Sequence, residues 1–122
     1  MVFTLYFGNL RVGRVSQTGA DFPSLSGTIA LDPSITQAQR GPKAEMARFI
    51  ELSRAALRLM EIEHLQDVTA EVAANVNDLA PFHGYIETDA WRLVDESGKS
   101  LPILAPIFAD ADEITWRWHP RL

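Results

Sequence analysis

The hydrophobic and polar positions at the start of the chain follow the two-residue period of β-strands. Residues 3–7 are rich in aromatic and β-branched side chains, and Gly8-Asn9 is a turn signal of the kind that joins the strands of a hairpin. Residues 10–15 also alternate, but imperfectly, because apolar and arginine side chains share a face. We therefore predict a hairpin and leave open which face of its second strand is buried.

A polar stretch separates this hairpin from a third predicted strand. Residues 16–24 contain glycine, proline, serine and threonine, a composition typical of a loop. Residues 25–31 are again largely apolar and predict a strand. The Asp32-Pro33 pair should end that strand, because proline fixes φ and has no backbone N–H. The first third of the chain is thus expected to form a β-meander.

The middle of the chain changes to a helical period. Pro42 suits the first turn of a helix, and residues 44–65 contain neither glycine nor proline. Charged side chains lie opposite an apolar stripe, which predicts an amphipathic helix laid on a sheet. The stripe consists of Met46, Phe49, Leu52, Ala56, Leu59 and Met60. Apolar residues between positions 68 and 79 keep helical spacing and predict a shorter helix, which Ala80-Pro81 would end.

The last third returns to strand-like patterns. Residues 84–88 and 90–94 are two candidate strands, and residues 95–99 form a hairpin turn signal. Residues 101–108 are apolar but contain two prolines, which cannot donate to a ladder. This strand should therefore lie at a sheet edge or be interrupted. After a short acidic turn, residues 114–118 predict the final strand.

Together these elements predict an α+β fold with the order β-meander, long helix, short helix, β-meander. The simplest packing is a single, largely antiparallel sheet with the long helix on one face. The length suits one domain, and no repeat, low-complexity tract or linker divides the chain, so we expect a single α+β domain over residues 1–122. The order of the strands does not follow from the sequence.

Composition and charge narrow the functional classes. Hydrophobic residues make up 47% and charged residues 22%, as in globular proteins, and no apolar run reaches the ~20 residues that span a bilayer. The start of the chain lacks the features of a secretory signal, so we expect a cytoplasmic protein with no membrane contact. Because there is no cysteine, disulfides and thiolate chemistry are excluded. The net charge of -5 argues against a nucleic-acid partner, since neither Arg11 with Arg14 nor Arg40 with Lys43 forms an aromatic-interleaved basic cluster.

Reactive residues show no spacing that identifies an active site, and an enzyme is therefore the less favoured prediction. No nucleophile elbow, phosphate-binding loop or dinucleotide fingerprint occurs, and the acidic residues 110–113 do not fit a calcium loop. We expect neither a metal nor a cofactor, because the three histidines belong to no ligand pattern. A pocket between sheet and helix remains an alternative, lined by His83, Tyr85 and His119.

The tryptophans offer a more specific hypothesis. Trp116 and Trp118 share one face of the last predicted strand, and Arg117 lies on the other. Burial statistics favour a core role for the tryptophans by about two to one. The other interpretation is an exposed binding surface, because tryptophan and arginine are enriched at interaction hot spots. That surface would consist of Trp91, Arg92, Trp116, Arg117 and Trp118.

The leading functional hypothesis is a non-catalytic protein-binding module. Small size, acidic charge and the aromatic-rich final strands favour it, and one version is an immunity- or regulator-type protein that binds a basic partner. The alternative is a small-ligand binder or enzyme that uses the pocket between sheet and helix. A third hypothesis is a homodimer that pairs an edge at residues 3–7 or 101–108 across a twofold. The sequence determines neither the process nor the identity of a partner or substrate.

Overall fold

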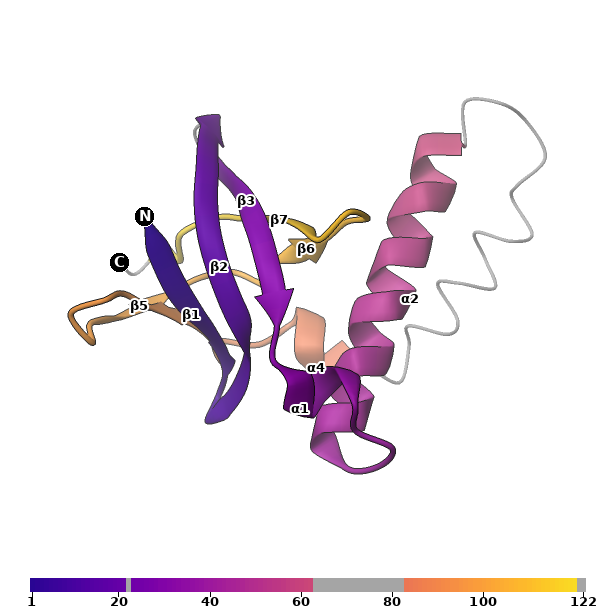
Figure 1. The fold of residues 1–122 in the computed structure, drawn as a ribbon. Coiled ribbons are helices and arrows are strands. Elements are labelled where there is room, and N and C mark those ends of the chain that lie inside the picture. Colours follow the sequence, from indigo (N-terminus) through magenta and orange to yellow (C-terminus); the bar gives the residue numbers. More distant parts are fainter. Residues whose placement is uncertain (22, 63–82, 121–122) are drawn as a thin grey trace.

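The computed structural model describes residues 1–21, 23–62 and 83–120, and these residues form one antiparallel sheet with a few helices, an α+β arrangement (Figure 1). The N-terminal strands are β1 (Val2–Phe7), β2 (Leu10–Asp21) and β3 (Ser24–Leu31). The C-terminal strands are β4 (Trp91–Val94), β5 (Ser100–Pro102), β6 (Ile107–Phe108) and β7 (Glu113–Trp116). The helices within this part of the chain are α1 (Pro33–Thr36), α2 (Pro42–Ile62) and α4 (His83–Ile86).

The C-terminal strands add to both edges of the N-terminal meander. β4 pairs with β1 and β7 pairs with β3, which gives the order β5-β4-β1-β2-β3-β7-β6. The β1–β4 register places Leu5 opposite Leu93 and Phe7 opposite Trp91, so apolar side chains meet across the pair. The continuous second meander predicted above is therefore wrong. Pairing through a free edge at residues 3–7 is also wrong, because β1 has a strand on either side.

The two ends of the sheet meet through the segment that connects β5 to β6. Ile103 forms an antiparallel bridge with Trp118; the Leu104 N–H donates to the Arg117 carbonyl at 3.0 Å, and the His119 N–H donates to the Pro102 carbonyl at 3.1 Å. This segment thus bonds to β4 on one side and to the residues that follow β7 on the other, which closes the strands into a barrel-like ring. In Figure 1, the traces that follow β5 and β7 pass behind β2. The prediction that the proline-containing strand is interrupted is confirmed.

β2 bends because it contains an extra residue opposite β1. The register moves by one position after Leu5, and Val12 is the residue left without a partner. This bulge places Val12 and Gly13 inside one after the other, while Arg11 and Arg14 remain exposed. It explains the imperfect alternation of the sequence, since a bulge interrupts the period of two.

β2 also continues through the region for which the composition predicted a loop. A second irregularity lies between Gln17 and Gly19, after which β2 pairs with β3 as far as Asp21, so the loop prediction for residues 16–24 is wrong. A glycine permits this close pairing: a Cβ on Gly27 would lie 2.2 Å from the Ser16 carbonyl oxygen. The strands therefore approach more closely than any side chain at Gly27 allows.

The interior is filled by apolar side chains, and no polar or charged residue is buried within the described ranges. α2 contributes Met46, Phe49 and Ile50, all buried, and Leu52 packs partly against them. The Phe49 ring contacts the rings of Trp91 in β4 and Phe108 in β6, each at 6.4 Å between centroids. The N-terminal half of the predicted stripe is thus part of the core. The side chains of Leu59 and Met60, and the helix expected over residues 68–79, lie outside what the structure describes.

Residues before β4 form a helical turn, and the strand predicted for residues 84–88 is wrong. The Tyr85 ring lies between Phe7, at 4.8 Å, and Phe49, at 5.1 Å. The Trp91 Nε1–H donates to the Tyr85 carbonyl at 2.7 Å. Because these contacts hold Tyr85 over the aromatic core, the chain turns there and does not extend alongside β4. None of the described helices combines the length and apolar character needed to cross a lipid bilayer.

Candidate functional site

The outward side chains of β4, β1 and β2 bring three arginines onto one face of the ring. Thr4 of β1 lies opposite Arg14 in β2 and opposite Val94 in β4. In the next outward row, Tyr6 lies opposite Arg11 and Arg92. Directly opposed side chains on one face of a sheet have Cβ atoms about 5 Å apart. Arg11 and Arg14 of β2 therefore lie on one side of β1, and Arg92 of β4 lies on the other.

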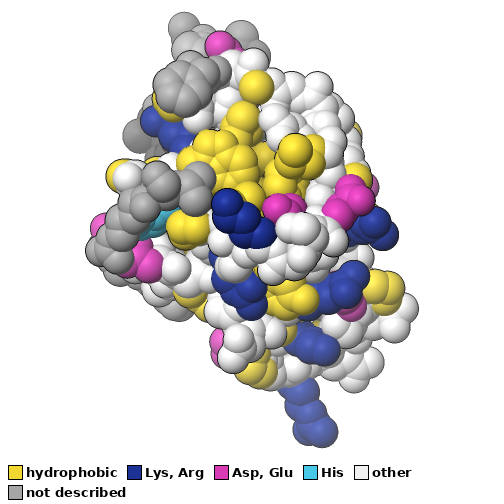
Figure 2. All heavy atoms as spheres, turned by 90° about the vertical axis from the view of Figure 1, so that its left-hand side faces the viewer, with side chains coloured by type: hydrophobic (Ala, Val, Ile, Leu, Met, Phe, Trp, Pro, Cys, Tyr) yellow, Lys and Arg dark blue, Asp and Glu magenta, His cyan; other side chains and the backbone are white. Residues whose placement is uncertain are grey.

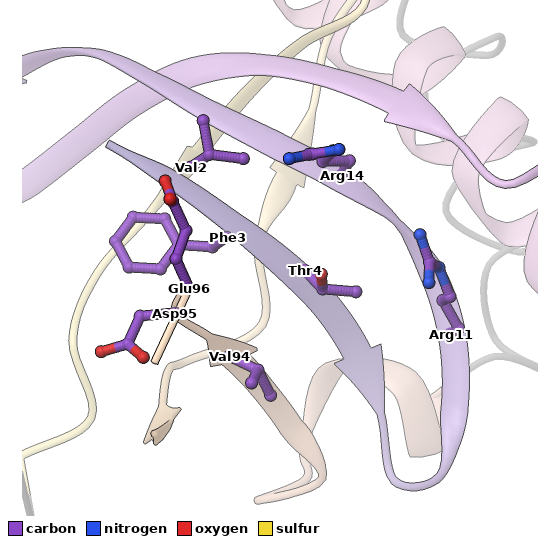
Figure 3. Close-up of a pocket in the computed structure, with 8 residues that line it drawn as sticks. All are labelled: Val2, Phe3, Thr4, Arg11, Arg14, Val94, Asp95 and Glu96. Carbon is purple, nitrogen blue, oxygen red and sulfur yellow. The ribbon is translucent and has the colours of Figure 1, made fainter. Parts of the chain in front are cut away.

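A groove of about 390 Å³ runs over this face, and we call it the arginine groove. It is lined by Val2, Phe3, Thr4, Arg11, Arg14, Val94, Asp95 and Glu96 (Figure 3). In Figure 3, Arg11 and Arg14 lie toward one end, and Asp95 and Glu96 lie toward the other. Figure 2 shows the molecule from the left-hand side of Figure 1, and on that side Lys and Arg side chains gather below a hydrophobic area. The groove thus carries charges of both signs.

Arg11 is partly neutralised by a carboxylate. Its Nε lies 3.2 Å from Oδ2 of Asp32, and Oδ1 of the same side chain accepts from the Ser34 N–H at 2.9 Å and from the Ser34 hydroxyl at 2.7 Å. These bonds cap α1. The hydrogen bonds from Ser34, with a smaller contribution from the Arg11 charge, hold the pKa of Asp32 below its usual value.

Arg92 is fixed in place beside the groove. Its guanidinium carbon lies 4.4 Å from the centroid of the Tyr6 ring, a cation–π contact, and its Nε donates to the Gly8 carbonyl at 3.2 Å. Arg14 differs from both other arginines. It is exposed, and its guanidinium makes no hydrogen bond or ion pair with any residue that the structure describes. Its donors are therefore available to a ligand.

The acidic end of the groove is built on a tight turn. The Asp95 carboxylate accepts from the backbone N–H groups of Ser97 and Lys99, both at 2.9 Å, and Gly98 adopts a φ of 90°. The turn predicted for residues 95–99 is confirmed. Hydrogen bonds, first of all from the Ser97 hydroxyl, lower the pKa of Asp95. Glu96 is exposed and adds a second acidic side chain at this end of the groove.

The structure does not bring the five residues of the predicted tryptophan and arginine surface together on one face. Trp91 is 0% exposed and Trp116 is 2% exposed; both belong to the core, as favoured above. Trp118 is half-buried, with its ring 6.1 Å from that of Phe3. Arg92 lies beside the arginine groove. Arg117 instead donates to the Ser24 hydroxyl at 3.3 Å and lines a separate groove of about 180 Å³.

The three residues predicted to line a pocket have different surroundings. Tyr85 is part of the aromatic core, and its burial, together with nearby Glu45, raises the pKa of its hydroxyl. His119 Nε2 lies 3.0 Å from the Asp89 carboxylate. His83 begins α4, and its side chain lies outside the description. Neither Tyr85 nor His119 lines either groove described above.

Neither a metal site nor a similarity to known proteins assigns a function to the described residues. No three histidine, aspartate or glutamate side chains gather to hold a metal ion within residues 1–21, 23–62 and 83–120. No protein-family model matches the chain, and no curated protein or solved structure is significantly similar to it. The function must therefore be argued from the residues themselves.

The sequence did not predict the arginine groove. Arg11 and Arg14 are close in the chain, but from the sequence alone they form no aromatic-interleaved basic cluster. Tyr6 and Arg92 were not connected with them, because their proximity depends on β1 pairing with both β2 and β4. The only local indication was that Thr4 and Tyr6 alternate with the apolar residues of their strand.

Proposed function

We propose that the protein is a non-catalytic protein-binding module that uses the outer face of β4, β1 and β2. The observation that carries this proposal is the location of the arginine groove on the outside of a ring whose interior is filled. Apolar side chains occupy the interior, and the groove presents Arg14 with its donors available. Arginine is enriched at protein-interaction surfaces compared with the rest of the protein surface.

The filled interior favours this function over a pocket between sheet and helix. The rings of Phe49, Trp91 and Phe108 contact one another where α2 meets β4 and β6. A small-ligand site or active site there would need a cavity with converging polar groups. The proposal includes a packing of the whole of α2 on one face of the sheet. The contacts of Phe49 support this packing for the N-terminal half of the helix.

The proposed partner is a different protein, met in the cytoplasm. A cysteine-free chain suits a reducing compartment. The net charge of -5 would steer a partner with basic surface toward the molecule, as expected of an immunity- or regulator-type protein. The arginine groove would then provide local contacts with acidic residues of that partner.

Affinity capture with the full chain from its native host tests the proposal. We expect to recover one stoichiometric partner. When the tag is placed on that partner instead, it should in turn capture this protein. The purified pair should elute as one complex in size-exclusion chromatography. Failure to recover a stoichiometric protein, or recovery only of further copies of this chain, would contradict a module that binds another protein.

A further inference from the structure

The arginine groove has the charge pattern of a site for a short segment with an acidic residue. Arg11 and Arg14 supply positive charge at one end, and Glu96 supplies negative charge at the other. The half-buried side chains of Val2 and Val94 lie in the groove and offer apolar contact to a ligand. The charges and the apolar contacts therefore suit an extended peptide better than a uniformly charged ligand.

Arg14 is the group best placed to bind a carboxylate. The Asp32 carboxylate already pairs with Arg11. The Tyr6 ring and the Gly8 carbonyl already hold the guanidinium of Arg92. Arg14 has no such partner among the described residues, and its planar guanidinium can donate two parallel hydrogen bonds to one carboxylate. The Thr4 hydroxyl, opposite Arg14 on β1, is a further donor in the same row.

We propose that the arginine groove docks an acidic segment of a partner protein, with a glutamate or aspartate carboxylate bound by Arg14. The carbon chain of the bound segment packs on Val2 and Val94, and a basic residue at its other end approaches Glu96. This inference rests on the proposed function and names the chemistry of the segment that the module recognises.

Nucleic acid fits the same groove less well. Binding to a phosphate backbone requires several cationic contacts to release counterions, and the whole chain carries a net charge of -5. Asp95 and Glu96 line the groove itself and would repel a polyanion that extended along it. A single carboxylate can lie at the arginine end without meeting these acids.

A peptide titration followed by NMR tests the chemistry directly. The probe is the blocked peptide Glu-Val-Ser-Val-Lys, and the control is the same peptide with glutamine in place of glutamate. At millimolar concentration we expect the glutamate peptide to move the amide signals of Thr4 and Arg14 most. If both peptides cause equal changes, or if the changes lie elsewhere, the proposed docking site is wrong.

Three substitutions assign the effect to particular arginines. Arg14→Glu should weaken binding of the glutamate peptide about tenfold, because an attraction becomes a repulsion. Arg117→Glu, an equal change of charge in the separate groove, should leave it unchanged. Asp32→Asn should strengthen binding about twofold, because it releases Arg11 while asparagine can still cap α1. Circular dichroism checks that each variant is folded.

The outcomes separate this inference from the function on which it rests. Three results would each overturn the assignment of the groove. The first two are equal binding of the glutamate peptide by wild type and Arg14→Glu, and loss of that binding in Arg117→Glu. The third is tighter binding of a twelve-nucleotide single strand than of the glutamate peptide. If the partner captured from the host is held equally by wild type and Arg14→Glu, the binding module stands and only the groove assignment fails. If no partner is captured, the function itself fails.

Discussion

Gly27 lies at a point where β3 closely approaches β2. An alanine there would place its Cβ 2.2 Å from the Ser16 carbonyl oxygen, which belongs to the backbone and has little room to move. We expect Gly27→Ala to lower the free energy of unfolding by about 1–3 kcal/mol, the usual cost of overpacking. Urea unfolding followed by tryptophan fluorescence measures it.

Gly84→Ala is the matched control for that substitution. No atom lies within 4 Å of a Cβ built at Gly84, and this glycine belongs to the short helix α4. Alanine forms helix more readily than glycine, so stability should stay the same or rise by up to about 1 kcal/mol. If both variants unfold at the wild-type urea concentration, the close approach of β2 and β3 does not exist.

Asp95 is expected to contribute to the pH dependence of stability. Its pKa lies below the usual value of 3.8, chiefly because the carboxylate accepts hydrogen bonds from Ser97 and Lys99. A lowered pKa in the folded state means that the ionised group stabilises the fold above about pH 4. This stabilisation is lost as the pH falls through the folded-state value. Asp95→Asn should therefore be less stable than wild type at pH 7, with a smaller difference at pH 2.5.

Urea unfolding of wild type and Asp95→Asn at both pH values measures that difference. A gap in unfolding midpoint that is as large at pH 2.5 as at pH 7 would show that the ionised carboxylate does not stabilise the turn. Asp32 should behave in the same direction, because hydrogen bonds from Ser34 lower its pKa too.

At the level of elements, α2 is joined to the strands through Phe49. Its ring stacks on Tyr85 at 5.1 Å and contacts Trp91 and Phe108. Phe49→Ala should lower the free energy of unfolding by about 3–5 kcal/mol, because it leaves a cavity among these rings. Arg48→Ala, an exposed neighbour on the same helix, should change stability by no more than about 0.5 kcal/mol. Equal stability of the two variants would show that α2 does not contribute to the core.

The elements that could be predicted are those set by local patterns. The strands near residues 3–7, 25–31 and 90–94 and the turn at 95–99 follow from alternation and turn chemistry, and the structure contains them. The turn of helix at α4 could not be predicted, because contacts of Tyr85 with residues far along the chain decide it. The extension of β2 to Asp21 depends likewise on pairing with β3 and overrides a loop-like composition.

At the scale of the whole molecule, strand order decides which surface can function. The pairing of β4 with β1 brings Arg92 beside Tyr6, which lies opposite Arg11 on its other side, although more than 80 residues separate Arg92 from both. The same closure directs the apolar side chains inward, including Trp91 and Trp116. The predicted surface of tryptophans is thereby replaced by a groove of arginines and acids. Of that groove, the sequence showed only that Arg11 and Arg14 are close in the chain.

Closure of the ring between Ile103 and Trp118 determines which surface can bind a partner, because a filled, closed interior leaves only the outside for binding. Amide hydrogen exchange at Leu104 and His119 tests it directly, since each N–H donates across the junction. We predict that both amides exchange as slowly as the central amides of β1 and β3. Exchange at the rate of unprotected loop amides would show that the sheet is open there and would contradict the account.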